Sequence, residues 1–261
     1  MAFYEPSAST KDNTPYKAAI GDSTAPSIFY FESIDSTNSE AKRAVLGGIE
    51  ADAVFIADGQ TGGRGRSGKS FYSPSGDGLY LSIVLSPDTT LAEATAITPI
   101  AAVIVTEVLR ELTDKEPKIK WVNDIFIDGK KVCGILTEAV FDHEIGKLSA
   151  VIIGIGINLT TTDFPTEIEG IAGSVGSIDR YLLTAEIFKR LKKACDKINT
   201  RDFMERYRKY SLVIGKEITF SKNGVDYCGV AKSILDDGGL LVNTKGGEMV
   251  LSSGEISIKL S

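Results

Sequence analysis

The sequence predicts an α+β fold in two domains, a larger one with a mixed sheet and a small C-terminal β-barrel. Strand and helix patterns alternate from residue 28, but the tight turn Asp128-Gly129 joins neighbouring strands as a hairpin and argues against a purely parallel sheet. After about Leu212 the pattern changes to short strands separated by turn signals, which is typical of a small antiparallel barrel. We therefore expect domains at residues 28–212 and 213–261.

The first elements follow from local signals. Residues 1–27 are rich in Ser, Thr, Asp and Pro and predict a mobile lead-in. Residues 28–34 are apolar and aromatic and predict a strand. Thr37 and Glu40 stand at the spacing of a capping box, which predicts a helix over residues 41–46 that a pair of glycines ends.

The middle of the chain alternates apolar strand patterns with two longer helical patterns. Helical periodicity spans residues 91–112, where Pro99 marks a start or a kink, and residues 182–210. The run at 149–157 is apolar at nearly every position, which is typical of a central strand buried on both faces. The expected strands of this region are residues 53–57, 79–85, 118–122, 125–127, 131–139 and 149–157.

Charge balance and rare residue types exclude several function classes. The chain has 29 basic and 35 acidic residues and a net charge of −6, which disfavours nucleic acid as its main partner. No run approaches the roughly 18 apolar residues of a spanning helix, so we expect no membrane partner. The three widely spaced cysteines fit the reducing cytoplasm. The single histidine, His143, is expected in an exposed loop, which leaves little material for a histidine metal site or a Ser-His-Asp triad.

The stretch Gly-Arg-Gly-Arg-Ser-Gly-Lys-Ser at residues 63–70 matches two phosphate-binding patterns at once. It fits G-x-x-x-x-G-K-[ST] of the phosphate loop and G-x-G-x-x-G of the dinucleotide fingerprint. Both patterns need a helix directly after the glycines, because free N–H groups at its N-terminus hold the anion. Here Pro74, Gly76 and Gly78 precede a strand instead. The context therefore disfavours both a P-loop NTPase and a dinucleotide site.

What remains is a long loop between two strands, residues 58–78, with seven glycines. It carries the cationic side chains Arg64, Arg66 and Lys69, and guanidinium groups bind phosphate oxygens bidentately. Loops of this length are usually either functional or disordered. Composition alone leaves two interpretations open, a phosphate-binding flap and a solvated hairpin loop.

Together with further stretches, this loop resembles the catalytic core of biotin–protein ligases. The resemblance covers about residues 28–261 and implies the family's α+β domain followed by a small SH3-like barrel. The matching stretches, in family order, are Asp35-Ser-Thr-Asn38, the loop run at 62–74, Lys120-Trp-Val-Asn-Asp124, Lys131-Val-Cys-Gly-Ile-Leu136, Gly154-Ile-Gly-Ile-Asn158 and Ser-Gly-Glu-Ile-Ser at 253–257.

The family's reaction has two half-steps. Biotin and ATP give biotinyl-5′-AMP and pyrophosphate, and a lysine of a biotin carboxyl carrier domain then takes the biotinyl group and releases AMP. Substrate groups supply both nucleophiles, so the protein must supply fixed cations and keep water from the mixed anhydride. ATP chemistry implies Mg²⁺, although the sequence shows no metal-ligand cluster.

By the resemblance, Lys131 contacts the biotin carboxylate and the α-phosphate, Arg64 and Arg66 lie over the same groups, and Asp124 orients or deprotonates the acceptor lysine. Without the family, Lys131 is an ordinary hairpin-turn lysine. The implied biotin contacts are Ser36, Thr37, Asn38, Gln60, Arg64, Gly65, Arg66, Lys131 and Gly134. The implied ATP contacts are Arg66, Lys69, Lys120, Asn123 and Asn158, with Gly154 and Gly156 beside the adenine. Trp121 is expected to pack in the core.

Some positions depart from the family pattern. Val122 stands where the motif commonly has proline, and Lys69 and Phe71 stand where arginine and tryptophan are frequent. The 27 residues before the core are too few for the family's DNA-binding winged helix, so we expect the short, non-repressor form. Two copies could associate as a homodimer through an exposed sheet edge. The alternatives are a lipoate–protein ligase or related acyl transferase, and a biotin-binding sensor without transfer activity.

Overall fold

The computed structural model describes residues 4–21, 26–49, 52–87, 89–142, 147–195 and 202–258. His143 lies outside these ranges. The helices are α1 (Thr14–Ile20), α2 (Thr37–Leu46), the 3₁₀ turn η2 (Arg66–Gly68), α3 (Leu91–Ala94), α4 (Ile97–Leu112), α5 (Thr166–Glu169), α6 (Arg180–Cys195) and α7 (Phe203–Tyr210). The strands are β1 (Ser27–Ile34), β2 (Ala53–Gln60), β3 (Gly78–Leu85), β4 (Lys118–Lys120), β5 (Asp124–Ile127), β6 (Lys130–Asp142), β7 (Lys147–Asn158), β8 (Glu217–Lys222), β9 (Val225–Ile234), β10 (Leu240–Thr244), β11 (Gly247–Leu251) and β12 (Ile256–Ile258).

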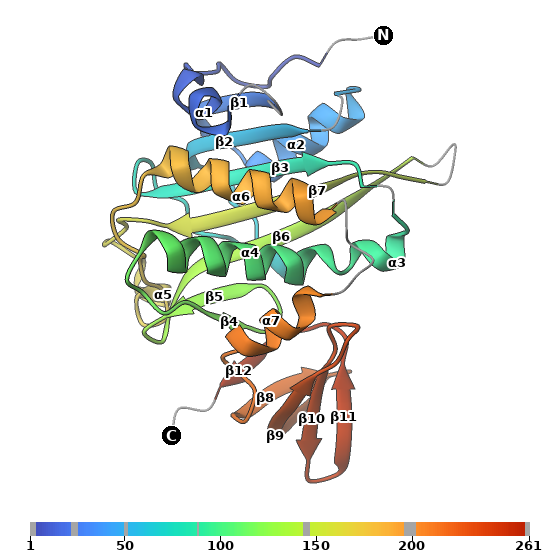
Figure 1. Ribbon diagram of the computed structural model, residues 1–261. Coiled ribbons are helices and arrows are strands. Elements are labelled where there is room, and N and C mark those ends of the chain that lie inside the picture. Colours follow the sequence, from blue (N-terminus) through green and yellow to red (C-terminus); the bar gives the residue numbers. More distant parts are fainter. Residues whose placement is uncertain are drawn as a thin grey trace.

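The larger sheet is mixed, as the sequence predicts. In the described part of the chain its strand order is β1-β2-β3-β7-β6-β5-β4 (Figure 1). β1 and β2 pair in parallel and the other neighbours pair antiparallel. The apolar strand β7 lies in the middle of this order, which confirms the prediction of a central strand. The α+β class is therefore confirmed.

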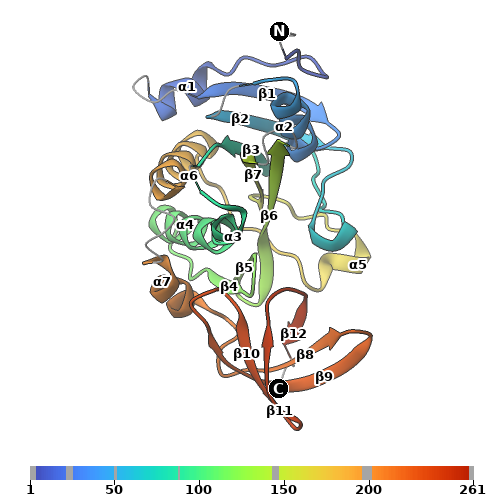
Figure 2. The same ribbon diagram turned by 90° about the vertical axis from the view of Figure 1, so that its right-hand side faces the viewer.

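The two faces of this sheet are covered differently. The helices α1, α4 and α6 lie on one face, and α2, the glycine-rich loop and α5 lie on the other (Figure 2). Because side chains alternate along a strand, Ile153, Ile155 and Ile157 of β7 join the larger core cluster on the α4 and α6 face. Gly154 and Gly156 then point to the opposite face, toward α2 and the loop.

The C-terminal strands form a second, antiparallel sheet with the order β11-β10-β9-β8-β12 among the described residues. It lies beyond the β4 end of the larger sheet (Figure 1). The Leu212 amide donates to Ile119 O at 2.7 Å, and the Trp121 indole donates to Gly238 O at 2.9 Å. Trp121 is 3% exposed and so packs in the core as predicted. Within the described residues the strand pairings form one five-stranded row, which does not by itself establish the small barrel that the pattern predicts.

The expectation of a mobile lead-in is corrected for the described residues 4–21. Thr10 forms a β-bridge with Phe31 of β1, and α1 follows. The Tyr16 side chain of α1 is fully buried and packs its ring edge-on against Tyr30 and Tyr181. These aromatic groups bury enough surface to fix the segment, and the polar composition around them concealed this.

Three helix predictions are corrected in detail. α2 begins at Thr37, with Ser36 as its N-cap, because Glu40 turns to Ser7 and Arg43 instead of closing a capping box. The pattern at 91–112 forms two helices, α3 and α4, and Pro99 lies in the first turn of α4, where a proline is tolerated. The pattern at 182–210 likewise forms α6 and α7. No helix in the described ranges is both long and apolar enough to cross a membrane.

Candidate active site

One cavity of about 1120 Å³ brings the predicted site residues together. It lies on the α2 side of the larger sheet and reaches the first and last segments of the C-terminal sheet. All the residues that the sequence predicts for catalysis, biotin and ATP line it: Ser36, Thr37, Asn38, Gln60, Arg64, Gly65, Arg66, Lys69, Lys120, Asn123, Asp124, Lys131, Gly134 and Asn158. The volume is ample for two small substrates side by side.

The floor of the cavity follows from strand register. Lys120 pairs with Asp124, Asp124 with Gly134, Gly134 with Gly156, and Gly156 with Tyr80. Register partners share a face of a sheet, so these residues form one row across five strands. The two glycines in the middle of the row lie under the Phe71 ring of the glycine-rich loop, and the charged pair stands at one end.

Lys131 reaches this row from the β5–β6 hairpin. Asp128 and Gly129 take positive φ angles of 50° and 75° in the turn, the conformation that Asp-Gly favours. Lys131 Nζ lies 2.8 Å from Asp124 Oδ1, with side chains 32% and 23% exposed. Its backbone is held by a bond from Lys131 N to Ile171 O at 2.7 Å and one from Gly173 N to Lys131 O at 2.9 Å. The ammonium group is therefore fixed at the cavity.

Lys120 adds a second ammonium group next to Asp124. Its Nζ lies 5.4 Å from the centre of the Phe126 ring. Burial lowers the pKa of Lys120, the Asp124 charge acts in the opposite direction, and the Lys131 charge lowers it further. Burial makes the charged form of Lys120 unfavourable, and its charge is not fully compensated by neighbours. An anion bound here would therefore be attracted strongly to this ammonium group.

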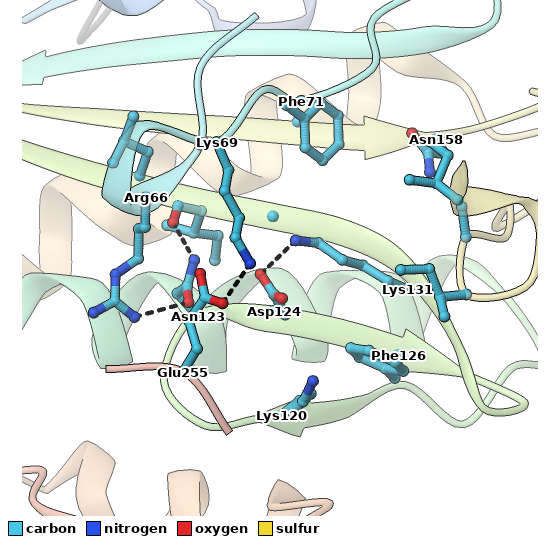
Figure 3. A pocket seen from close by; sticks show the side chains of 18 of the residues that line it. Arg66, Lys69, Phe71, Lys120, Asn123, Asp124, Phe126, Lys131, Asn158 and Glu255 are labelled. Atoms are coloured by element: carbon cyan, nitrogen blue, oxygen red, sulfur yellow. Dashed lines mark hydrogen bonds and ion pairs between the residues drawn. The ribbon is translucent and has the colours of Figure 1, made fainter. Parts of the chain in front are cut away.

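The glycine-rich loop lies above this floor (Figure 3). η2 is a single 3₁₀ turn, and the described residues 69–77 contain no helix. This agrees with the prediction that the loop is neither a P-loop nor a dinucleotide site, since both need a helix directly after the glycines. Arg66 donates to Asn123 Oδ1 at 3.1 Å, and Asn123 Nδ2 donates to Ile135 O at 2.7 Å. Lys69 points down beside Asp124 and forms an ion pair with Glu255, the residue directly before β12.

The two arginines of the loop have different partners. Arg64 binds Glu138 of β6 bidentately, at 3.0 and 2.9 Å. Glu138 also accepts from Asn38 Nδ2 at 2.9 Å. Arg64 therefore lies on the α2 side of the cavity, whereas Arg66 lies by Asn123 near the charged end of the floor.

A buried polar cluster joins the N-terminus of α2 to the sheet. The Thr37 amide donates to Gln60 Oε1 at 2.9 Å, and Gln60 Nε2 donates to Ser73 Oγ at 2.9 Å. Ser82 Oγ donates to Asn38 Oδ1 at 2.6 Å and lies 2.7 Å from Thr37 Oγ1. These bonds hold the polar groups of α2 in one arrangement before any ligand binds.

Close contacts leave no space for a side chain at two positions of β7, so both are glycine. A Cβ atom at Gly154 would lie 2.1 Å from Asn38 Oδ1, and one at Gly156 would lie 2.5 Å from Cε1 of Phe71. Asn158 follows at the end of the strand, 5% exposed, and donates from Nδ2 to Gly173 O at 3.0 Å. Its buried Oδ1 has no hydrogen-bond partner among the described residues, so it can accept from a ligand N–H.

Sequence reasoning missed Ser82 and Glu138, which bind side chains of the site from behind. Ser82 is the one polar side chain inside the apolar run of β3, and it is fully buried. Glu138 is a carboxylate inside β6, on the face that holds Gly134 and Leu136. Both carried a signal, a polar residue at an inward position of a strand, but their partners are distant in the sequence.

Comparisons with known proteins agree with this geometry. The profile of the Biotin/lipoate A/B protein ligase family matches residues 30–158. The Bifunctional ligase/repressor BirA of Bacillus subtilis (strain 168) is 32% identical over 246 residues, which are 88% of this chain and 74% of that protein. The biotin–[acetyl-CoA-carboxylase] ligase of Mycobacterium tuberculosis (strain ATCC 25618 / H37Rv) is 27% identical over 243 residues, which are 85% of each chain.

A solved structure is similar over nearly the whole length. The biotin protein ligase from Aquifex aeolicus in complex with biotin and ATP has a TM-score of 0.73 and 27% sequence identity, and the similarity covers 90% of this chain and 99% of that one. The sequence motifs, the cavity that gathers them and these comparisons lead to one assignment. The chain belongs to the Biotin/lipoate A/B protein ligase family and, within it, to the biotin–protein ligases.

Proposed function

We propose that this protein activates biotin with ATP to biotinyl-5′-AMP and transfers the biotinyl group to a lysine of a biotin carboxyl carrier domain. The observation that carries the proposal is the meeting of Lys131, Lys120 and Lys69 around Asp124, at one end of a glycine floor and under an arginine-bearing loop. One of the named relatives is a biotin–[acetyl-CoA-carboxylase] ligase, and the similar structure from Aquifex aeolicus is a biotin protein ligase in complex with biotin and ATP.

In the first half-step, an oxygen of the biotin carboxylate attacks the α-phosphorus of ATP. The bond from that phosphorus to the oxygen bridging to the β-phosphate breaks, and pyrophosphate leaves. Lys131, fixed through its backbone and its ion pair, neutralises the carboxylate and the α-phosphate as they approach. Arg66 and Lys69 stand on the loop side to bind the remaining phosphate oxygens. Fixed cations of this kind need little reorganisation when negative charge develops.

Biotin and the nucleotide have separate parts of the cavity in this proposal. The ureido ring of biotin is held by Ser36, Thr37, Asn38 and Gln60, because their fixed hydrogen-bonding groups suit its donors and acceptor. Arg64 lies beside these residues, because Glu138 binds both Arg64 and Asn38. Gly65 of the loop and Gly134 of the floor lie beside the valeryl chain. Asn158 takes the adenine, since its buried Oδ1 can accept from the exocyclic amine.

In the second half-step, the uncharged amine of the acceptor lysine attacks the carbonyl carbon of the mixed anhydride, and AMP leaves. A free lysine has a pKa near 10.4, so most acceptor molecules must lose a proton first. Asp124 is the carboxylate next to the reacting groups, and we assign it to orient the amine and take that proton.

We treat Mg²⁺ as part of the ATP substrate. The described residues contain no group of three or more His, Cys, Asp or Glu side chains that could hold a metal ion. Mg²⁺ usually takes one or two carboxylates together with substrate phosphates and water, and Asp124 fits that donor set. The ion would reduce the charge on the phosphates that leave.

The C-terminal sheet and the cellular setting complete the proposal. We assign residues 213–261 to the family's SH3-like barrel, supported by the antiparallel strands and by Glu255, which contacts Lys69 of the loop. We place the reaction in the cytoplasm. Cys133 and Cys195 are buried and Cys228 is exposed, and their wide spacing in the sequence suits a reducing environment.

Incubation of the protein with labelled biotin, ATP, Mg²⁺ and a biotin carboxyl carrier domain tests the proposal against lipoate in a parallel reaction. We expect biotin-dependent pyrophosphate release and label on one acceptor lysine. Labelling from lipoate alone would establish a lipoate ligase instead. Biotin binding without pyrophosphate release would establish a sensor.

A further inference from the structure

The glycine-rich loop stands on a buried charged cluster that lies outside the cavity. Asp58 is 8% exposed and lies near the end of β2, the strand that leads into the loop. Its carboxylate accepts from Lys11 Nζ at 2.7 Å, from the Tyr30 hydroxyl at 2.8 Å and from an Arg180 nitrogen at 2.8 Å. Burial acts to raise the pKa of Asp58, but the bonds from Lys11 and Tyr30 and the Arg180 charge outweigh it and hold that pKa below its usual value.

Arg180 also holds the other end of the loop. Its second terminal nitrogen donates to Gly78 O at 3.2 Å, and Gly78 is the first residue of β3, directly after the loop. One guanidinium group therefore joins both feet of residues 58–78. Backbone bonds run beside it, from Gly76 N to Asp58 O and from Gln60 N to Ser73 O, each 3.1 Å long.

The position of Arg180 is not explained by the helix that carries it. Arg180 is the first residue of α6, and Asp179 caps this end by accepting from the amides of Tyr181 and Leu182 at 2.9 and 3.2 Å. The N-terminus of a helix is the unfavourable end for a positive charge. The partners of Arg180 are Asp58 and Gly78 at the two ends of the loop. These contacts explain why an arginine stands at the N-terminus of α6.

The contacts also connect the loop to segments outside the matched family region. Lys11 and Arg180 both lie outside residues 30–158. Lys11 belongs to the segment that runs beside β1, where its amide donates to Tyr30 O at 2.6 Å. Arg180 follows the segment that holds the Lys131 backbone through Ile171 and Gly173. The loop feet, the N-terminal segment and the first residue of α6 therefore share one cluster.

We propose that Arg180 is a positioning residue for the reaction, holding both feet of the glycine-rich loop through Asp58 and Gly78 so that the loop closes at one place. This role rests on the proposed function for the reaction that the loop serves. Arg180 does not line the cavity. It acts through Arg66 and Lys69, whose distance from the phosphates depends on where the feet stand, and through the exclusion of water from the bound adenylate.

The first test needs no substrate. Arg180→Lys keeps a positive charge beside Asp58, but a single ammonium nitrogen replaces the two nitrogens that reach separate partners. We expect hydrogen exchange in residues 58–78 of the ligand-free protein to become at least about 10-fold faster in this variant. Arg190→Ala is the matched control, because Arg190 lies on the same helix and forms ion pairs with Glu111 and Glu186 away from the loop. It should leave exchange in the loop unchanged.

The second test measures leakage of the intermediate. Water that reaches biotinyl-5′-AMP attacks the anhydride and gives free biotin and AMP. The ratio of AMP released to biotin transferred to the acceptor does not depend on the fraction of folded enzyme. We expect Arg180→Lys to raise this ratio about 5-fold and Arg190→Ala to leave it at the wild-type value.

The outcomes separate this inference from the proposed function. If hydrogen exchange at the loop is unchanged in Arg180→Lys, Arg180 does not hold the feet of the loop, whatever the activity of the variant. Faster exchange with an unchanged ratio overturns the positioning role. Absence of biotin-dependent pyrophosphate release by the wild-type protein refutes the proposed function, and the exchange experiment still decides whether Arg180 holds the loop.

Discussion

Lys131 Nζ and Asp124 Oδ1 lie 2.8 Å apart across the β5–β6 hairpin. The hairpin turn brings together two residues that are close in the sequence, and the sheet register places Asp124 in the row that forms the cavity floor. In the proposed mechanism this pair supplies a cation for the anionic first half-step and a carboxylate for the second, so both half-steps would use one place.

Lys131→Ala should lower the rate of adenylate formation by about 100-fold or more, the usual cost of losing a group that stabilises developing charge. The stability of the fold should change by less than about 1 kcal/mol, because the ion pair is partly exposed. Biotin-dependent pyrophosphate release and thermal unfolding measure the two effects. Lys232→Ala, which removes an exposed ion pair with Glu248, is the control. Normal pyrophosphate release by Lys131→Ala would contradict the role.

Gly156→Ala should displace the loop, because its new Cβ atom would lie 2.5 Å from the Phe71 ring. We expect kcat/KM for ATP to fall by at least about 10-fold, since misplacing a positioning group by about an ångström costs this much or more. Kinetics of pyrophosphate release measure it. In a Phe71→Ala background the same substitution should cost less than about 3-fold, since the clash is gone. Equal costs in both backgrounds would exclude this contact as the cause.

The affinity for ATP should fall at alkaline pH as Lys120 loses its proton. Burial lowers the pKa of this lysine, so the loss begins below the ordinary lysine value of 10.5. The effect of Lys120 on the stability of the ligand-free protein has the opposite pH dependence. Between the folded and unfolded pKa values of Lys120 the unfolded chain binds more protons, so stability rises with pH. Lys120→Arg stays charged and should move the alkaline limit of ATP binding upward.

Titration of ATP binding from pH 7 to 10.5 checks this prediction. Lys118→Arg is a matched control, because Lys118 lies on the same strand with its side chain 40% exposed. Its binding profile should coincide with that of the wild type. If Lys120→Arg also shows the wild-type binding profile, the alkaline limit belongs to another group.

Asp58 should contribute stability at neutral pH that is lost in acid. Its folded pKa is lower than the usual 3.8, so the contribution is fully present above the unfolded pKa and disappears as the pH falls through the folded value. Asp58→Asn should cost about 3 kcal/mol at pH 7, because Lys11 and Arg180 lose their counterion. Urea unfolding of both proteins at several pH values from 7 to 2.5 measures the difference, which should shrink below pH 3.8. A difference that does not vary with pH would disprove the electrostatic origin.

Local patterns in the sequence were sufficient to predict most of the strands, whereas the candidate residues came from the resemblance to a known family. Apolar runs predicted the buried strands β3 and β7, because a strand covered on both faces needs apolar side chains at every position. The Asp128-Gly129 turn predicted the hairpin that carries Lys131. The glycine, proline and strand signals after residue 68 predicted that no helix follows the loop. Each of these depends on a few adjacent residues.

The tertiary structure decided which side chains meet. Lys69 and Glu255 are 186 positions apart, and Arg64 finds Glu138 while Arg66 finds Asn123. The packing of residues 4–21 and the buried position of Ser82 likewise escaped the sequence patterns. Residue type and spacing determine local conformation, since neighbours along the chain share the same dihedral angles and turns. Contacts between distant segments depend on strand order and register, which the packing of the whole chain selects.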